Sequence, residues 1–242
     1  MSTERAEIRV RGLAVQIVRK DIKNLHLGVY PPNGRVRVAV PLGVNNHAVQ
    51  LAVIGKLGWI KRKRAMFATQ ERQSPREYVT GESHYFLGQR YRLNVVTRDG
   101  TAAVVIRNNR TIDLFVRKGS DTAYRERVFL AWYRRQLKKM IPSLIQKWEV
   151  IVGVKVREWC VKKMKTKWGS CNGKAHRIWL NLELAKKSVQ CLEYILVHEM
   201  VHILERHHND RFKLLMDEFM PQWRLHRDEL NRAPLGQETW SY

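Results

Sequence analysis

The 242-residue chain has few cysteines, no long hydrophobic run and few acidic side chains. Its three cysteines, Cys160, Cys171 and Cys191, are too few and too irregularly spaced for a disulfide framework or a zinc knuckle. No stretch of about 18 uncharged apolar residues occurs, so no membrane-spanning helix and no membrane partner are expected. Residues 1–12 carry charges and no apolar core, which argues against a secretory signal and for a cytoplasmic location.

The shortage of acidic residues leaves a large positive charge. The chain has 22 Asp and Glu residues and 45 Lys and Arg residues, which gives a formal net charge of +23. Such a field attracts polyanions. A single basic run is usually a solvated helix face, but in this context nucleic acid becomes a candidate partner. The candidate polyanion-binding residues are Lys61, Arg62, Lys63 and Arg64.

The pattern before residue 120 is typical of short strands. Residues 35–40 alternate strictly, with valine at every second position, directly after the turn-forming segment 31–34, and more strands are predicted between residues 83 and 116. A helix is expected over residues 45–67. Strands this closely spaced favour antiparallel hairpins, so we predict an antiparallel β-rich module with one helix over residues 1–120. No internal repeat is evident.

The character of the chain changes after residue 120. We predict a long helix to about residue 148, strands near residues 154–164 and 178–184, and a further helix that begins at Ser188. Hydrophobic residues make up 44% of the chain, enough for a substantial core. The sequence therefore predicts an α+β protein whose second domain covers residues 121–242.

The chemically informative segment is His198-Glu199-Met200-Val201-His202. Two histidines four residues apart project from one face of a helix and can bind one ion, and neutral imidazole suits Zn2+. Glu199 lies beside them and can move a proton to and from water. The apolar flanks indicate a buried helix, in which polar side chains without partners would be costly. We therefore expect His198 and His202 to bind zinc and Glu199 to act as the catalytic acid/base.

A third ligand is needed to complete a zinc site that keeps one open position. On a continuous helix Glu205 would stay on the face of the two histidines. If the helix ends near residue 206, His208 can turn back to the ion, and Asn209 can cap a new helix. We favour His208 over Glu205 and over a later acid such as Glu218 or Glu229.

The loop before the second predicted strand of this half contains four further candidate residues, Lys165, Trp168, Gly169 and Ser170. One interpretation is a wall of the substrate cleft, with Gly169 and Ser170 presenting backbone donors. The other is a tight loop whose tryptophan fills the core. Both interpretations stay open, and both can hold together.

Several segments carry a family resemblance: residues 164–171 with Lys-Trp-Gly-Ser-Cys, residues 180–182, the segment 197–202, residues 208–212, and the turn 81–88 in the N-terminal half. Together they resemble the YgjP-like family of HExxH metallopeptidases. The resemblance implies a zincin-like C-terminal domain, one zinc ion held by His198, His202 and His208, and Glu199 as acid/base. His207 and Asn209 depart from the family pattern, which commonly has Asn and Ser there. A nucleotide pyrophosphatase activity has also been attached to the family.

The leading hypothesis is therefore a zinc-dependent metallopeptidase that acts on protein or peptide substrates, in the vicinity of nucleic acid. The first alternative is a metal-dependent nucleotide pyrophosphatase, which hydrolyses a phosphoanhydride at the same site. The second is a basic nucleic-acid-binding module whose metal site is not catalytic.

Overall fold

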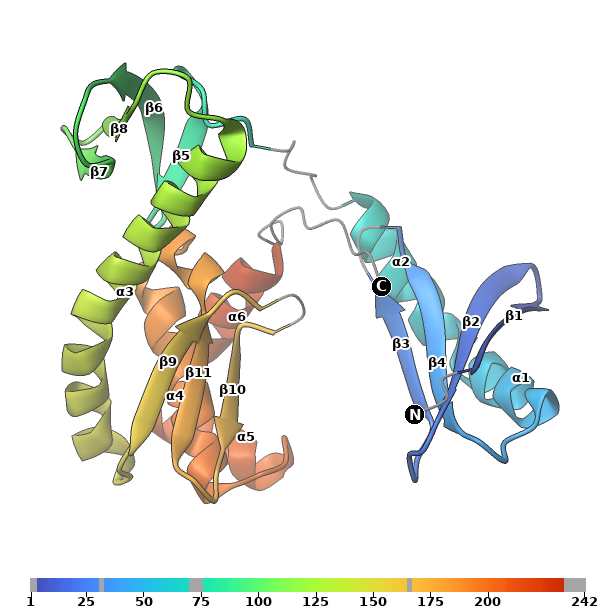
Figure 1. Cartoon of the computed structure of the whole chain (residues 1–242). Helices are drawn as coiled ribbons and strands as arrows, with labels where there is room; N and C mark the ends of the chain where they lie inside the picture. Colours follow the sequence, from blue (N-terminus) through green and yellow to red (C-terminus); the bar gives the residue numbers. More distant parts are fainter. Residues whose placement is uncertain (1–3, 31–32, 70–75, 165–166, 233–242) are drawn as a thin grey trace. The chain divides into compact units, whose positions relative to one another are not determined.

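The computed structural model describes residues 4–30, 33–69, 76–164 and 167–232. The chain forms two compact units, unit 1 over Met1–Gln73 and unit 2 over Ser74–Tyr242 (Figure 1). None of the helices in the described residues is long and apolar enough to span a bilayer. Each unit is described by itself below.

Unit 1 is a four-stranded sheet covered by two helices. The strands occur in the order β1-β2-β4-β3, with bounds β1 Glu4–Val10, β2 Leu13–Lys20, β3 His26–Tyr30 and β4 Arg35–Pro41. The helices are α1 Asn46–Gly55 and α2 Leu57–Thr69, and the side chain of Asn45 caps α1. Alternate strand residues point inward. They pack with Val49, Val53 and Ile60 of the helices into one apolar core.

Unit 2 begins with a second sheet of the same topology. Its order is β5-β6-β8-β7, with bounds β5 Ser83–Phe86, β6 Gln89–Thr97, β7 Ala103–Ile106 and β8 Thr111–Val116. The first hairpin of each sheet turns through two residues with positive φ, Arg11 and Gly12 in one and Leu87 and Gly88 in the other. Such turns suit the twist of a hairpin, and glycine adopts them without strain. The two sheets therefore repeat one topology and one hairpin turn, although no repeat is evident in the sequence.

The sheets differ from the antiparallel arrangement expected from the sequence. In each sheet the central pair is parallel: β2 with β4, and β6 with β8. β3 and β7 each lie at a sheet edge, antiparallel to the strand that follows them in the chain. Short spacing along the chain favours a hairpin, but it does not force consecutive strands to be neighbours.

The division between the units falls at residues 73 and 74, whereas the sequence suggested one near residue 120. The long helix α3, Thr122–Val152, explains the difference. Its Phe129 and Trp132 contact the second sheet, where Phe86 and Trp132 have ring centroids 4.8 Å apart. The same helix contributes to the core of the C-terminal helices, so residues 74–120 share that core.

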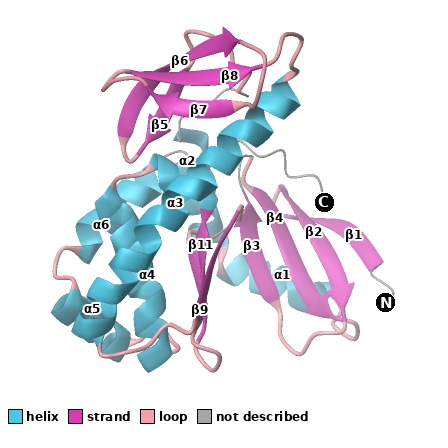
Figure 2. Cartoon of the chain, turned by 60° about the vertical axis from the view of Figure 1, so that its left-hand side comes forward, coloured by secondary structure: helices cyan, strands magenta, loops and turns pink. Residues whose placement is uncertain are grey.

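The remaining elements pack around one helix, α4 (Val189–Leu204), which Figure 2 shows among its neighbours. A three-stranded sheet has the order β10-β11-β9, with β9 Glu158–Lys162, β10 Gly169–Asn172 and β11 Arg177–Asn181. The 3-10 helix η1, Leu182–Lys186, leads to α4 Val189–Leu204, α5 Asp210–Phe219 and α6 Trp223–Arg232. Most of α4 is buried, which agrees with its apolar sequence. β10 is an edge strand and contacts α4.

A buried histidine gives unit 2 a pH-dependent stability. His84 lies among the rings of Tyr78 and Phe129, and its Nε2 is 3.3 Å from a carboxylate oxygen of Glu82. Burial lowers the pKa of His84 from 6.5 to about 4. Between pH 6.5 and about pH 4 the histidine is therefore protonated in the unfolded chain but neutral in the folded chain. Because the unfolded state binds more protons, the free energy of unfolding decreases as the pH falls across this window.

We expect His84→Gln to flatten this part of the pH profile, because glutamine does not titrate. Between pH 6.5 and 4.5 the wild-type protein should lose roughly 1–3 kcal/mol more unfolding free energy than the variant. Urea unfolding at the two pH values, with metal removed from both proteins, measures the difference. Parallel profiles for the two proteins would contradict the assignment.

Candidate metal centre

Helix α4 presents the first two histidines. The side chain of Ser188 caps its start by accepting from the main-chain N–H of Cys191, and the helix ends at Leu204, where Glu205 takes an extended conformation. His198 and His202 lie on one face, one turn apart, and their ring centroids are 4.9 Å apart. This early end frees the following residues from the helical path.

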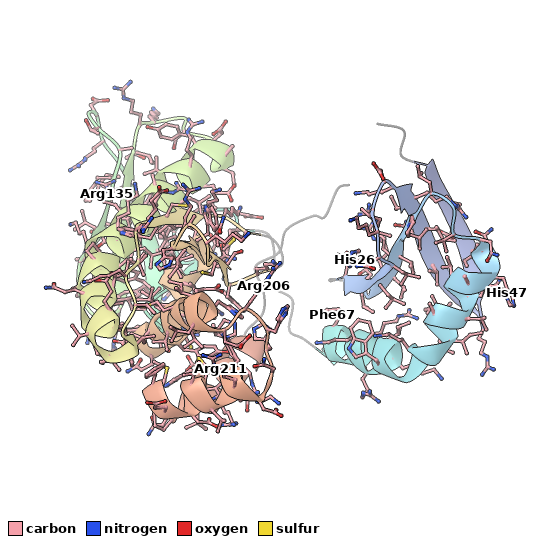
Figure 3. The ribbon with its side chains drawn as sticks, turned by 90° about the horizontal axis from the view of Figure 1, so that it is seen from below. His26, His47, Phe67, Arg135, Arg206 and Arg211 are labelled. Carbon is pink, nitrogen blue, oxygen red and sulfur yellow. The ribbon has the colours of Figure 1, made fainter. Side chains whose placement is uncertain are left out.

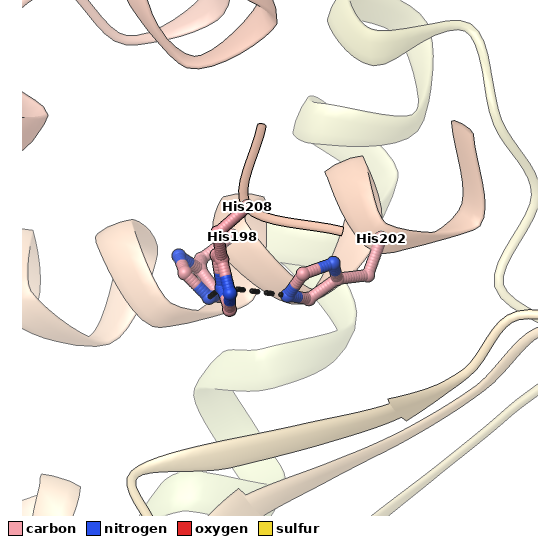
Figure 4. A group of neighbouring side chains, drawn as sticks. All are labelled: His198, His202 and His208. Carbon is pink, nitrogen blue, oxygen red and sulfur yellow. Dashed lines mark hydrogen bonds between the residues drawn. The ribbon is translucent and has the colours of Figure 1, made fainter. Parts of the chain in front are cut away.

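His208 reaches the two histidines from the turn after α4. The side chain of Asn209 accepts from the main-chain N–H of Phe212 and caps α5, as the sequence predicts. The Nε2 atom of His208 lies 3.1 Å from Nε2 of His202 and 3.0 Å from Nε2 of His198 (Figure 4). All three ligand atoms lie within 4.8 Å of one another, so the group can hold a metal ion.

The chemistry of the three side chains fits a divalent metal. Burial, reinforced by the neighbouring imidazoles, lowers the pKa of His198 to about 3, and burial also lowers the pKa of His202. Both are therefore neutral near pH 7, the form that binds zinc. Nδ1 of His202 is 3.0 Å from the carbonyl oxygen of Glu205. A proton on that nitrogen leaves the Nε2 lone pair for an ion.

The acidic alternatives for the third ligand are engaged elsewhere. The carboxylate of Glu205 accepts from the main-chain N–H of His207 at 3.0 Å, and the carboxylate of Glu229 accepts from the hydroxyl of Ser188 at 3.0 Å. Neither they nor Glu218 join the metal-binding group formed by the described residues. The geometry therefore favours His208.

Glu199 is a buried carboxyl group, only 5% exposed. Burial raises its pKa to about 8, against a smaller lowering by the positive charge of Lys167. A carboxyl group that titrates near neutral pH can both accept and donate a proton under physiological conditions. Its place next to His198 on α4 brings this capacity to the metal-binding group.

The first residue of β10 packs against Glu199. A Cβ atom added to Gly169 would lie 2.5 Å from Oε1 of Glu199 and 2.8 Å from its Cγ. Only a glycine therefore lets the strand backbone approach this carboxyl group so closely. Ser170 follows in β10, half-buried, and Trp168 is half-buried against the core. Lys165 lies outside the described residues.

Asn181 holds this loop in place, a role that the sequence did not reveal. Its side-chain amide donates to the carbonyls of Met164 and Lys167, at 2.8 and 2.7 Å. Its main-chain N–H donates to the carbonyl of Trp168 at 2.9 Å. Asn181 is 2% exposed and belongs to β11, so the loop is fixed by the neighbouring strand.

Two aromatic residues complete the surroundings. Phe212 lies against all three imidazoles, with ring centroids 4.7 to 4.9 Å from those of the histidines. Tyr194, one turn before His198, has its ring 5.9 Å away. Phe212 is the first buried residue of α5, a pattern that signals core packing but not a contact with the histidines.

Cys171 lies near Glu199, although it is not part of the metal-binding group among the described residues. Burial, with a smaller contribution from the charge of Glu199, raises the pKa of the thiol to about 11. The thiol is therefore neutral at pH 7, and a metal would have to displace its proton. The geometry, with Cys171 outside the group of three histidines formed by the described residues, supports a site with three protein ligands.

The basic run sits in the other unit. Lys61, Arg62 and Arg64 are exposed on α2, and Lys63 is partly buried. Figure 3 shows His26 and His47 in unit 1 as well, while Arg206 and Arg211 lie in unit 2 on the segment that carries His208. Within unit 2 the structure brings together the histidine motif and Gly169 of β10, and the basic run belongs to unit 1.

Comparison with known proteins shows a family for this chain. The family model described as "YgjP-like, metallopeptidase domain" matches residues 23–233. No curated protein matches the chain. Among solved structures, the chain is similar to the crystal structure of the metallopeptidase zymogen of Pyrococcus abyssi abylysin, with 19% identity and a TM-score of 0.36. That match covers 38% of this chain and 91% of the other.

The family match spans most of the chain and includes both the turn at residues 81–88 and the histidine motif. The predicted α+β class is confirmed by the helices and mixed sheets of the described residues. This chain belongs to the YgjP-like metallopeptidase family.

Proposed function

We propose that the protein is a zinc-dependent peptidase whose ion is held by His198, His202 and His208. The observation that carries this proposal is the convergence of the Nε2 atoms of three imidazole side chains. Three nitrogen ligands leave a fourth position open, which is the arrangement of catalytic zinc sites rather than structural ones. Zinc is favoured by the ligand type, with another divalent metal as the alternative.

The bound ion would polarise the peptide carbonyl and lower the pKa of water at the site. Glu199 takes a proton from the attacking water and later donates it to the leaving amine nitrogen. Burial supports both steps, because it raises the pKa of Glu199 into the range where the carboxyl group can change protonation state. The backbone of Gly169 lies against that carboxyl group from the strand side.

The edge strand β10 favours a peptide substrate. It is terminal in the order β10-β11-β9, so one side of its backbone has no strand partner among the described residues. An extended peptide can add to such an edge through main-chain hydrogen bonds. Because Gly169 of the same strand touches Glu199, a peptide there would lie close to the carboxyl group.

A nucleotide phosphoanhydride is the second candidate substrate. The observation in its favour is the positive charge of Lys167, which acts on Glu199 and would also attract a phosphate. Fluorogenic peptides and nucleoside triphosphates, each assayed with the zinc-loaded and the chelator-treated enzyme, distinguish the two. Zinc-dependent release of pyrophosphate without cleavage of any peptide or protein would replace the peptidase proposal.

We expect His208→Ala to lose most of its zinc, because it removes one of three converging nitrogens. His207→Ala is the matched control, since the neighbouring imidazole is exposed and is not in the metal-binding group. Metal analysis of purified variants should give close to one zinc per chain for wild type and His207→Ala, and well under half for His208→Ala. Equal zinc in both variants would exclude His208 as a ligand.

A further inference from the structure

Units 1 and 2 contain the same scaffold with different surfaces. Both sheets have the same strand order and hairpin turn, and each continues into a helix capped by a side chain, Asn45 for α1 and Asp121 for α3. The interval in the sequence from Arg11 to Leu87 equals that from Asn45 to Asp121. The second sheet is built into the core of the metal-binding half, whereas the first has its own core and its own helices.

The sheet of unit 1 has an inner face covered by the two helices and an outer face that the helices leave uncovered. The helices pack on the inner face through Val49, Val53 and Ile60. The outer face, at alternate positions, carries the small side chains Ala14 and Ala39, the buried Val18, the polar Gln16 and the acid Glu7. Its cationic positions are Arg9, Lys20, Arg35 and Arg37.

An aromatic ring lies beside Gly28 on this outer face. A Cβ atom added to Gly28 would be 2.7 Å from Cε2 of Tyr30, so the Tyr30 ring lies over the backbone of Gly28. In the strand register Gly28 pairs with Arg37, and Tyr30 pairs with Arg35. The ring and both arginines are therefore neighbours on one face.

On the corresponding face of the second sheet, one position carries an acid that is paired with a base. Asp113 of β8 occupies the position that Arg37 occupies in β4, by the same sequence interval. Its carboxylate accepts from Asn94 at 2.8 Å and forms an ion pair with Arg107 at 2.6 Å. The common scaffold therefore does not require arginine at this position.

Unit 1 cannot neutralise its own charge. Residues 1–73 contain 14 Lys and Arg and 4 Asp and Glu, so ten cations remain even if every acid pairs with a base. Residues 74–242 contain 31 and 18, an excess of 13 over more than twice the length. Positive charge is therefore nearly twice as dense in the smaller unit, which calls for an anionic partner.

We propose that the outer face of the unit 1 sheet, carrying Arg9, Arg35, Arg37 and Tyr30, binds single-stranded nucleic acid. Arginines contact the phosphates, and a base stacks on the ring of Tyr30. This pairing of cations with an aromatic ring on an open sheet is the chemistry that recognises unpaired bases. A membrane surface fits less well, because the exposed apolar side chains Leu42, Leu51 and Ile54 lie on and beside α1, not on this face.

The test is fluorescence anisotropy of a labelled 20-nucleotide oligo-dT with the full-length, zinc-loaded protein. Arg9→Gln/Arg37→Gln should weaken binding about tenfold or more. It should also reduce the slope of log K against log salt concentration by about 1.4, since each lost phosphate contact removes about 0.7. Tyr30→Ala should weaken binding about fivefold or more without changing the slope, because it removes stacking but no charge. Arg90→Gln/Arg92→Gln, on the exposed outer face of the second sheet, is the charge-matched control and should bind within about twofold of wild type.

Thermal melts and zinc content establish that each variant is folded, and Arg9→Gln/Lys20→Gln, which changes two exposed side chains, replaces the first variant if that one does not fold. The proposal is overturned if the control loses as much affinity for oligo-dT as the sheet variants. It is also overturned if Lys61→Gln/Arg62→Gln on α2 weakens binding and the sheet variants do not. Stronger binding to phosphatidylserine vesicles or to duplex DNA than to oligo-dT also overturns it. Glu199→Gln should bind as wild type, which separates this proposal from the peptidase.

Discussion

Replacing Glu199 with glutamine is expected to reduce peptide hydrolysis about 10²- to 10⁴-fold, the usual contribution of a general acid/base. The amide has nearly the same shape but cannot take the proton from water or return it to the amine. Burial already favours the neutral form of this side chain, as the pKa of about 8 indicates, so the variant should fold normally. Its zinc content should also be unchanged, because Glu199 is not among the three converging ligands.

Glu193→Gln is the matched control for this experiment. Glu193 lies on the same helix α4, but its carboxylate accepts from Lys147 at 2.9 Å and from the indole of Trp148 at 3.1 Å. Its loss should change stability slightly and leave turnover within about twofold, since the pair with Lys147 is near the surface. Full turnover in Glu199→Gln with zinc bound would rule out the proposed acid/base role.

The arrangement around His198 and His202 could be predicted because its signals are local. Four-residue spacing on an apolar helix determines one face, whatever packs against it. The position of His208 could also be predicted, because Asn209 is a strong helix cap and implies a break after Leu204. These features depend on a few neighbouring residues and on backbone geometry alone.

The features that the sequence did not predict depend on distant partners. The parallel pairing of β6 with β8 brings together strands that β7 separates along the chain. The core shared by α3, the second sheet and the C-terminal helices places residues 74–120 in unit 2. Nothing in the sequence near Asn181 shows that its side chain bonds to the carbonyls of Met164 and Lys167, and only the fold brings these groups together. Tertiary packing decides each of these.

The second large effect is expected at Gly169, a position with no chemistry of its own. A methyl group there would meet Oε1 and Cγ of Glu199 and Cγ2 of Ile195 at 2.5 to 2.8 Å. Gly169→Ala must therefore displace either the strand or the carboxyl group. A shift of about 1 Å in a catalytic group can lower turnover about 10²-fold. Overpacking should also cost about 1–3 kcal/mol of stability.

Gly55→Ala is the control, because a methyl group at Gly55 meets nothing within 4 Å. Both variants should keep about one zinc per chain, since neither changes a histidine. If Gly169 positions Glu199, the loss in Gly169→Ala appears in kcat of peptide hydrolysis while KM changes little, and Gly55→Ala behaves as wild type. A stable, zinc-loaded Gly169→Ala enzyme with wild-type kcat would mean that the strand yields without moving Glu199. A merely structural role would instead lower the melting temperature and leave kcat per folded, zinc-bound chain unchanged, so the two readouts together decide whether the close approach of β10 serves the carboxyl group.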